Sequence, residues 1–525
     1  MPQKPAANRL LSNAALVGAA TMTSRITGFV RDIFIAAFLG AGPLAEIFVI
    51  AFRLPNLFRR LFAEGAFNAA FVPLFSERLT QDGRPAALGF AGQVFSVLLA
   101  ALCLFTLLAQ LFMPSLVLAL AQGFAGDAEK FAAAVHYARI SFPYLLCMSL
   151  LSLFAAMLNA VGRFFAAAFA PVLLNLVLIA ALGLAWLQAS DGTSGASVAL
   201  DYLIWGVAVA GLVQLAFVFA AAWRAGLCLP LGAPRLSKDV RHVWGLAVPG
   251  ILAAGIGQIN LLVGTSIATG QAGAAAWLYY ADRLYQLPMG VIGVALSVAL
   301  LPALAKHLAA GQIAAARDSQ NMAVLAAGLL TLPAAAGLFA LAEPIVTLLF
   351  ERGAFGAADS ASTALLVQIF CFGLPAFVFV KALQPSFFAR QDTKTPLIDG
   401  AIGVAVNITL SLSLFPSYGA PAIALATGVA GYVTLVLMLI RLARRGIWRA
   451  DTRVVARLFG QLAAACGMAF VLMHLAQAFP PPIGLAALAL WCGGFIGLGA
   501  ILFFVLARLF GALRAGDLGR LRGRG

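Results

Sequence analysis

Eight basic residues lie inside long apolar segments of this 525-residue chain, where a cation is costly. Two of them share the run Ser24-Arg25-Ile26-Thr27-Gly28-Phe29-Val30-Arg31-Asp32. The others are Arg53, Arg59, Arg60, Arg139, Arg283 and Lys381. An arginine at the centre of a bilayer costs about 2.5–3.5 kcal/mol on insertion scales, so it must face water or a protein partner. The forked donors of a guanidinium suit phosphate oxygens, which makes these positions candidates for binding an anion.

Acidic residues accompany the cations but are fewer. Glu46, Arg53 and Arg60 recur every seven residues and Glu64 follows four later, which predicts one polar helix stripe beside Arg59. Asp282 and Arg283 lie about ten residues into their segment, roughly 15 Å from its outer end and near the midplane. The excess of guanidinium predicts a cavity for an anion and disfavours cationic drugs.

Structural explanations stay open for several of these residues. Arg25 and Asp32 fall on one helix face, so Asp32 with the first-segment arginines, and Asp282 with Arg283, could be ion pairs that only hold helices together. Arg59, Arg60 and Glu64 could extend to the cytoplasmic interface, and we expect Lys381 to do so. For Arg139, packing and function are both open.

The positions of the remaining charges predict how the chain crosses a membrane. We expect 14 spans, at 11–39, 44–77, 88–118, 131–160, 164–188, 200–223, 240–269, 273–306, 318–341, 360–388, 396–415, 419–442, 454–476 and 483–509. The termini and the even-numbered loops hold 24 of the 34 Lys and Arg, whereas the odd-numbered loops hold only Lys130 and Arg352. Basic loops remain cytoplasmic, so we predict an all-α polytopic membrane protein with both ends in the cytoplasm.

Composition excludes other classes of protein. Charged residues make up 10% of the chain and hydrophobic ones 63%, against about 25% charged residues in soluble domains. The net charge of +15 is distributed over loops and the membrane interior, so we expect no nucleic-acid binding. The six cysteines form no C-x-x-C pair, and we find no phosphate-binding Gly-Lys loop and no nucleophile–base pair. We therefore expect neither an enzyme nor a bound cofactor or metal.

Weak internal repeats suggest two lobes. Arg53, Pro73, Pro143 and Asn175 match Arg283, Pro302, Pro375 and Asn407 at offsets of 229–232 residues. We predict a six-helix lobe in residues 1–235, a parallel six-helix lobe in 236–450, and two further helices with a basic tail in 451–525. Transporters with repeats commonly place their site between the halves.

The same residues carry a family resemblance over essentially the whole chain. The first-span run above, the run from Arg53-Leu-Pro-Asn-Leu-Phe-Arg59-Arg60 to Phe67, and Phe71-Val-Pro73 closely resemble the MurJ (MviN) family of bacterial lipid II flippases. Further similar stretches are Ala281-Asp282-Arg283-Leu284, Pro288-x-Gly290-Val-x-Gly293 and Gln391-Asp392-Thr-Lys394-Thr-Pro396.

The resemblance implies the multidrug/oligosaccharidyl-lipid/polysaccharide exporter superfamily, with two six-helix lobes that alternate between inward- and outward-open states. It implies that Arg25, Arg31, Arg59 and Arg283, with Glu46 and Glu64, receive the pyrophosphate and headgroup of lipid II. The last two spans would form, with the second lobe, a groove for the polyprenyl tail. The expected location is the bacterial inner membrane, and the expected partners are lipid II, membrane lipids and cell-wall synthesis proteins around a monomer.

One departure concerns the coupling ion. Relatives described as sodium-binding have an Asp in the seventh span, but this chain has no carboxylate between Asp239 and Asp282. Asp399, Asn407 and Thr409 are left as partial ligands, so dependence on membrane potential is the better expectation. Three alternatives to a lipid II flippase stay open: an exporter of another oligosaccharide-lipid or drug, a non-transporting scaffold for cell-wall enzymes, and, less favoured, an enzyme acting on polyprenyl pyrophosphate.

Overall fold

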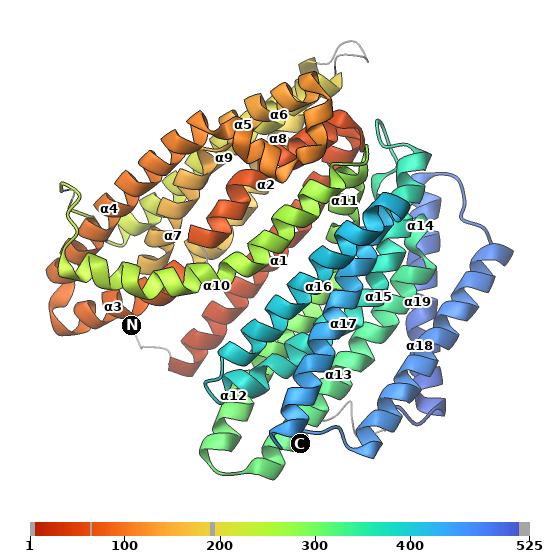
Figure 1. Cartoon of the computed structure of the whole chain (residues 1–525). Helices are drawn as coiled ribbons and strands as arrows, with labels where there is room; N and C mark the ends of the chain where they lie inside the picture. The colour runs from red at the N-terminus through yellow and green to blue at the C-terminus, as the bar shows by residue number, and fades with distance from the viewer. Residues whose placement is uncertain (1–5, 63–65, 189–194, 231, 514–525) are drawn as a thin grey trace. The chain divides into compact units, whose positions relative to one another are not determined.

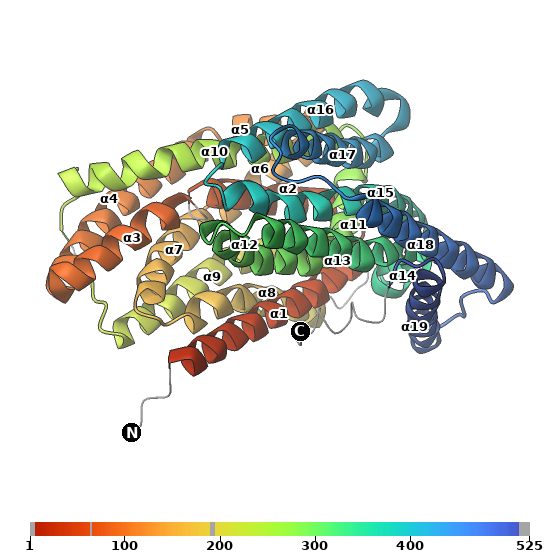
Figure 2. The same ribbon diagram turned by 90° about the horizontal axis from the view of Figure 1, so that it is seen from below.

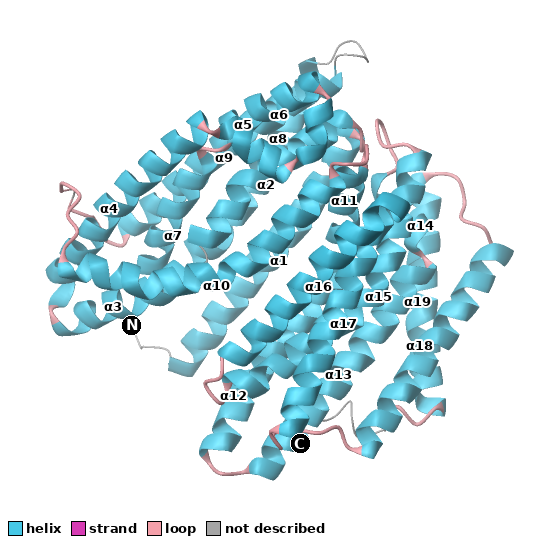
Figure 3. Cartoon of the chain, viewed as in Figure 1, coloured by secondary structure: helices cyan, strands magenta, loops and turns pink. Residues whose placement is uncertain are grey.

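The computed structural model describes residues 6–62, 66–188, 195–230 and 232–513. Every regular element in these ranges is a helix, and no strand occurs among them (Figure 3). The all-α prediction is confirmed. Glu64 lies outside the described residues, as does most of the basic tail.

The chain forms two compact units that are not contiguous in sequence. The first unit comprises Met1–Ala276 and Arg352–Phe355, and the second comprises Trp277–Glu351 and Gly356–Gly525. The first unit contains α1 (Ala6–Leu39), α2 (Pro43–Phe62), α3 (Ala66–Gln81), α4 (Gly83–Leu111), α5 (Met113–Leu120), the 3₁₀ turn η1 (Gln122–Gly126), α6 (Ala128–Ser141), α7 (Tyr144–Ala160), α8 (Phe165–Gln188), α9 (Gly195–Arg224) and α10 (Lys238–Ala268) (Figure 1).

The second unit begins within α11 (Ala274–Pro288). It continues through the π-helical turn η2 (Met289–Gly293), α12 (Val294–Ala309), α13 (Ile313–Ala340), α14 (Ala342–Phe350), α15 (Ala357–Phe388), α16 (Lys394–Tyr418), α17 (Ala420–Arg444), α18 (Thr452–Ala478) and α19 (Leu485–Leu509).

Eleven described helical segments are long and apolar enough to cross a membrane. The predicted count of 14 is not confirmed. The predicted spans outside this set are 11–39, 44–77 and 240–269, of which the first two carry most of the buried charge. The predicted span 44–77 contains α2 up to Phe62 and α3 from Ala66. The third predicted span divides into α4 and α5, and the fourth into α6 and α7.

Within the first unit, α1 packs along α8, and α8 packs in turn against α9 (Figure 2). The long helix α10 packs on α3 and α2 of the same unit. An ion pair of 2.7 Å between Arg78 and Asp239 fixes its first turn. The predicted boundary between the two lobes, at residue 235, lies just before α10. That boundary was drawn from internal sequence repeats, and it stays a prediction.

Within the second unit, α15 is the central helix and packs against α13 and α17. The C-terminal end of α15, which the predicted topology places near the cytoplasm, contributes Phe387 to a buried cluster with Leu442 and Trp448. Helix α18 packs on α13 and α19 around Met468 and Phe503. These side chains give the unit its own apolar core.

Contacts between loops agree with a path that crosses the membrane alternately. Contacts at even-numbered loops join Arg78 to Asp239, Arg84 to Ala225, Arg445 to Asp392 and Arg317 to Gly446. Contacts at odd-numbered loops join Lys130 to Glu46, Gly123 to Thr269 and Trp277 to Asp359. Each of these contacts therefore joins groups from the same predicted side.

A short strap, residues 352–355, belongs to the first unit by its contacts. The Ala354 N–H donates to the Ala37 carbonyl at 2.8 Å, at the end of α1. Gly353 has φ +58°, and a Cβ there would lie 2.2 Å from the Ala37 oxygen. Only glycine fits this close approach of two backbones.

Candidate functional site

The first cluster of the candidate site is built on one stripe of α1. Ser24, Thr27, Gly28 and Arg31 are spaced so that they share the face of α1 that meets α8. A Cβ on Gly28 would lie 3.3 Å from the Asn175 amide nitrogen, so glycine lets Asn175 of α8 come close. The sequence analysis predicted Arg25, Arg31 and Asp32 of α1 as site residues, but not Asn175.

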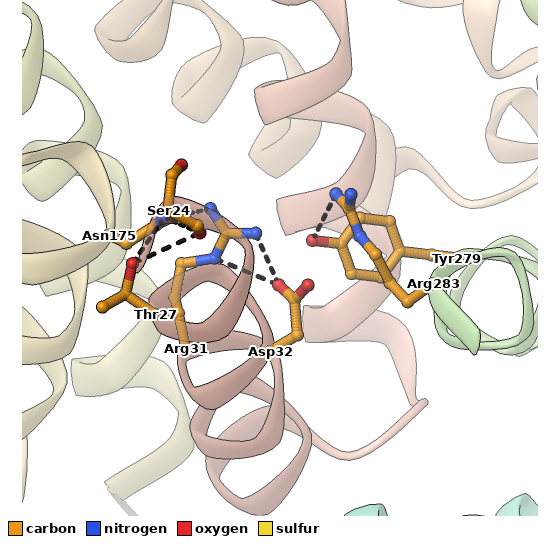
Figure 4. Close-up of polar contacts among 7 residues, drawn as sticks. All are labelled: Ser24, Thr27, Arg31, Asp32, Asn175, Tyr279 and Arg283. Carbon is orange, nitrogen blue, oxygen red and sulfur yellow. Dashed lines mark hydrogen bonds and ion pairs between the residues drawn. The ribbon is translucent and has the colours of Figure 1, made fainter. Parts of the chain in front are cut away.

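Arg31 is buried and held by three side-chain hydrogen bonds (Figure 4). Its Nε and Nη2 donate to Asp32 Oδ1 at 3.0 and 2.6 Å, and Nη1 donates to Asn175 Oδ1 at 2.8 Å. Its guanidinium also lies 5.9 Å from the Phe52 ring centre. Arg31 is 5% exposed and Asp32 1%, so a buried pair of opposite charges neutralises itself here. In this structure Arg31 and Asp32 therefore form the intramembrane ion pair that the sequence analysis left open as a structural explanation.

Arg25 differs from Arg31 in its surroundings. Arg25 directly follows Ser24 in α1 and is half-buried. It makes no hydrogen bond or ion pair with any residue that the structure describes. Because Arg31 and Asp32 cancel, Arg25 carries the net positive charge of this cluster. A guanidinium in that position has donors available for a ligand.

Helix α2 carries the next group of cations. Arg53 is half-buried and donates from Nη1 to Thr265 Oγ1 of α10 at 2.5 Å. Arg59 Nε donates to Asn56 Oδ1 at 3.1 Å, one turn back on the same helix. Arg60 is exposed, in agreement with a place at an interface. The structure therefore spreads the predicted stripe over different environments.

Glu46 has a partner that the sequence pattern did not supply. Lys130 reaches it from the first turn of α6, with Nζ 2.5 Å from Oε2, and the side chains of Lys130 and Glu46 are 13% and 1% exposed. The ammonium also lies 4.1 Å from the Phe124 ring centre. The sequence did not single out this pair, because Asp127 and Glu129 in the same odd-numbered loop were equally available as partners for Lys130.

The second unit holds the Arg283 cluster. Arg283 is half-buried; its Nη2 donates to the Tyr279 hydroxyl at 3.2 Å, and its guanidinium carbon lies 4.8 Å from the centre of the same ring (Figure 4). Asp282 instead accepts a hydrogen bond from Gln286 one turn later. The Tyr279 side chain thus contributes to orienting Arg283, as Asn175 does to orienting Arg31.

The three residues predicted as partial ion ligands do not converge. Asp399 is fully buried and 2.7 Å from Arg441 Nε of α17. Asn407 lies eight residues along α16, about 12 Å at the helical rise, and accepts from Ser411 at 3.3 Å. Thr409 is exposed. No group of three His, Cys, Asp or Glu that could hold a metal occurs in the described part of the chain.

The two undecided cations are both exposed. Arg139 and Lys381 have exposed side chains, and only their backbone carbonyls accept the described hydrogen bonds, from Gln110 and Ser297. Neither joins the clusters around Arg31 or Arg283 through a described contact.

Comparison with known proteins decides the family. The family model described as "Lipid II flippase MurJ" matches residues 35–489. A protein of Rhizobium meliloti (strain 1021), "Probable lipid II flippase MurJ", is 47% identical over 511 residues, which cover 96% of this chain and 94% of that protein. The chain belongs to the MurJ family. The resemblance carried by the arginine motifs is confirmed.

Solved structures of a MurJ protein and of a MATE transporter share the fold of this chain. The structure described as "Lipid II flippase MurJ, inward closed conformation" matches with a TM-score of 0.77 and 21% identity, covering 97% of this chain and all of that one. An inward-facing multidrug resistance MATE family transporter of the MOP superfamily matches with a TM-score of 0.67 and 14% identity, over 83% of this chain and 98% of its own. At these identities the match concerns the fold alone. The MurJ family is one of transporters, and this member is a multi-pass membrane protein.

Proposed function

We propose that this protein moves lipid II, the undecaprenyl-pyrophosphate-linked peptidoglycan precursor, from the cytoplasmic to the outer leaflet of the bacterial inner membrane. Family membership over most of the chain carries the proposal. The site residues assigned below are a further part of it.

The charge pattern supports an anionic substrate. Arg25 has no hydrogen-bond or ion-pair partner among the described residues, so its guanidinium can offer donors to a pyrophosphate. Arg283, which donates to the Tyr279 hydroxyl, is the second guanidinium assigned to the pyrophosphate. Arg53, Arg59 and Arg60 add positive charge along α2. Arg31 belongs to the same binding site. The acidic residues set the position or charge of these cations: Asp32, Glu46, Glu64 and Asp282. A cationic drug would be repelled by the same arginines.

Transport proceeds by alternating access, as in the superfamily whose fold the chain shares. A negative-inside potential favours outward movement of the anionic substrate and return of the empty cationic site. Each elementary charge contributes about 2.3 kcal/mol per 100 mV. The guanidinium of Arg441 at Asp399 supports this drive over sodium, because it already neutralises that carboxylate.

The remaining assignments complete the proposal. Both termini lie in the cytoplasm, and the protein works as a monomer alongside cell-wall synthesis proteins. The lobes comprise 1–235 and 236–450, and residues 451–525 supply α18 and α19 for the polyprenyl tail. The exposed apolar side chains Phe459, Phe470, Ile496 and Ile501 on these helices suit that role.

Native mass spectrometry tests the substrate and the site together. Lipid II and phosphatidylglycerol are compared on the wild type, on Arg25→Ala/Arg283→Ala and on Arg163→Ala. Arg163 is an exposed loop arginine and is the matched control. We expect selective retention of lipid II by the wild type and the control, lost in the double variant. Equal binding of both lipids by the wild type would refute the proposal and favour a scaffold or another substrate.

A further inference from the structure

Asn175 is a buried amide at the point where α8 meets α1. It is 4% exposed and makes three side-chain hydrogen bonds, all to α1. Its Oδ1 accepts from Arg31, and its Nδ2 donates to the Ser24 carbonyl at 2.9 Å and to Thr27 Oγ1 at 3.2 Å (Figure 4). These bonds connect the turn that carries Arg25 to the side chain of Arg31.

The chemistry of the partners fixes which way the amide points. A guanidinium only donates and a carbonyl oxygen only accepts, so the oxygen of Asn175 must face Arg31 and its nitrogen must face Ser24. A carboxylate at this position would keep the bond to Arg31 but lose both donors. It would also change the net charge of Arg25, Arg31, Asp32 and residue 175 from +1 to zero. The position therefore calls for a neutral group with an acceptor at one end and a donor at the other.

Asn175 does two things for the cationic cluster. It occupies the Nη1 donor of Arg31 without adding negative charge, so the surplus charge of Arg25 remains. It also anchors the carbonyl of Ser24, the residue immediately before Arg25, and so restricts the backbone from which Arg25 projects. Gly28 makes this possible, because a larger side chain would push the two helices apart.

We propose that Asn175 is a positioning residue for substrate binding: it orients Arg31 and the Arg25-bearing turn of α1 toward the pyrophosphate while keeping the cluster cationic. This inference rests on the proposed function. Asn175 itself does not touch the substrate and acts through Arg25 and Arg31.

Lipid II affinity of the detergent-solubilised full chain tests the assignment. Asn175→Ala should weaken lipid II binding about 3–10-fold, the loss expected for one or two hydrogen bonds around charged groups. Asn175→Asp should weaken it further, despite being closer in shape, because it removes the surplus charge. Raising the salt concentration should reduce the difference between these two variants.

Gln320→Ala is the matched control. Gln320 is a similarly buried amide in the second unit. It donates to the Ala382 carbonyl at 2.9 Å and accepts from the Ser386 hydroxyl at 2.6 Å, so it joins α13 to α15. It makes no described contact with an arginine of the candidate site. Both alanine variants should lower the melting temperature by a similar few degrees. Only the change at Asn175 should lower affinity for lipid II.

A double variant separates positioning from general support. If Asn175 acts through Arg25 and Arg31, Asn175→Ala/Arg25→Ala should lose less affinity than the sum of the losses in the two single variants. Additive losses, or an Asn175→Ala affinity equal to that of Gln320→Ala, would overturn the inference while leaving lipid II as the substrate. A wild type that does not prefer lipid II over phosphatidylglycerol would overturn both.

Discussion

The Lys130–Glu46 ion pair allows a structural carboxylate to be distinguished from a substrate-binding one. The pair is 2.5 Å long, and its carboxylate side chain is 1% exposed. Replacing Lys130 by Met leaves that carboxylate buried without its cation. Removing one member of a buried pair costs about 3–5 kcal/mol. We therefore expect Lys130→Met to lower the melting temperature strongly and to abolish transport through loss of folded protein.

The compensating double variant carries the decisive information. Glu46→Gln/Lys130→Met contains no unpaired charge, and neutral replacement of a buried pair is often tolerated. The double variant should therefore be more stable than Lys130→Met and should recover most of the transport. The two effects are measured by thermal unfolding in detergent and by lipid II translocation in vesicles.

Two results would contradict this explanation. Stability losses that simply add in the double variant would mean that the two side chains do not depend on each other. A double variant that is stable but does not bind lipid II would return Glu46 to the substrate site, as the family resemblance first implied.

Three further outcomes are expected from single changes. Tyr279→Phe keeps the ring beside Arg283 but removes the hydroxyl acceptor, so lipid II affinity should fall no more than about threefold, whereas Tyr279→Leu should cost about tenfold; equal effects would exclude a role for the ring. Gly353→Ala should destabilise the protein in thermal unfolding, because Cβ would clash with the Ala37 oxygen at a left-handed φ, while Gly356→Ala, with open space around it, should not; similar melting temperatures would argue against the strap. Hydrogen bonds from Thr395 and the Arg445 guanidinium lower the pKa of Asp392 to about 2, so its stabilising effect should be present above about pH 4 and disappear as the pH falls through 2; a stability difference between wild type and Asp392→Asn that does not shrink on acidification would contradict this.

The sequence predicted the parts of the site that depend on position along one helix. Arg25, Arg31 and Asp32 stand out because charge inside an apolar segment is rare. The relation of Arg283 to Arg53 followed from a repeat offset. These features need no knowledge of which helices pack together, and they were sufficient to find the family.

The partners of these residues could not be predicted because they lie on other helices. Asn175 appeared in the sequence only as a repeat match to Asn407, since a single Asn in an apolar helix does not reveal what it faces. Lys130 and Thr265 were missed for the same reason. The packing of α10 in the first unit depends on tertiary contacts alone.

Translocation of lipid II by the purified protein tests the central claim most directly. Vesicles carry lipid II with a fluorescent headgroup, and a membrane-impermeant quencher reports how much of it reaches the outer leaflet. We predict that the wild type and Arg163→Ala expose inner-leaflet lipid II much faster than protein-free vesicles, and that Arg25→Ala and Arg283→Ala lose most of this activity. A wild-type rate equal to that of protein-free vesicles would contradict the proposed function, and full activity in both arginine variants would contradict the site.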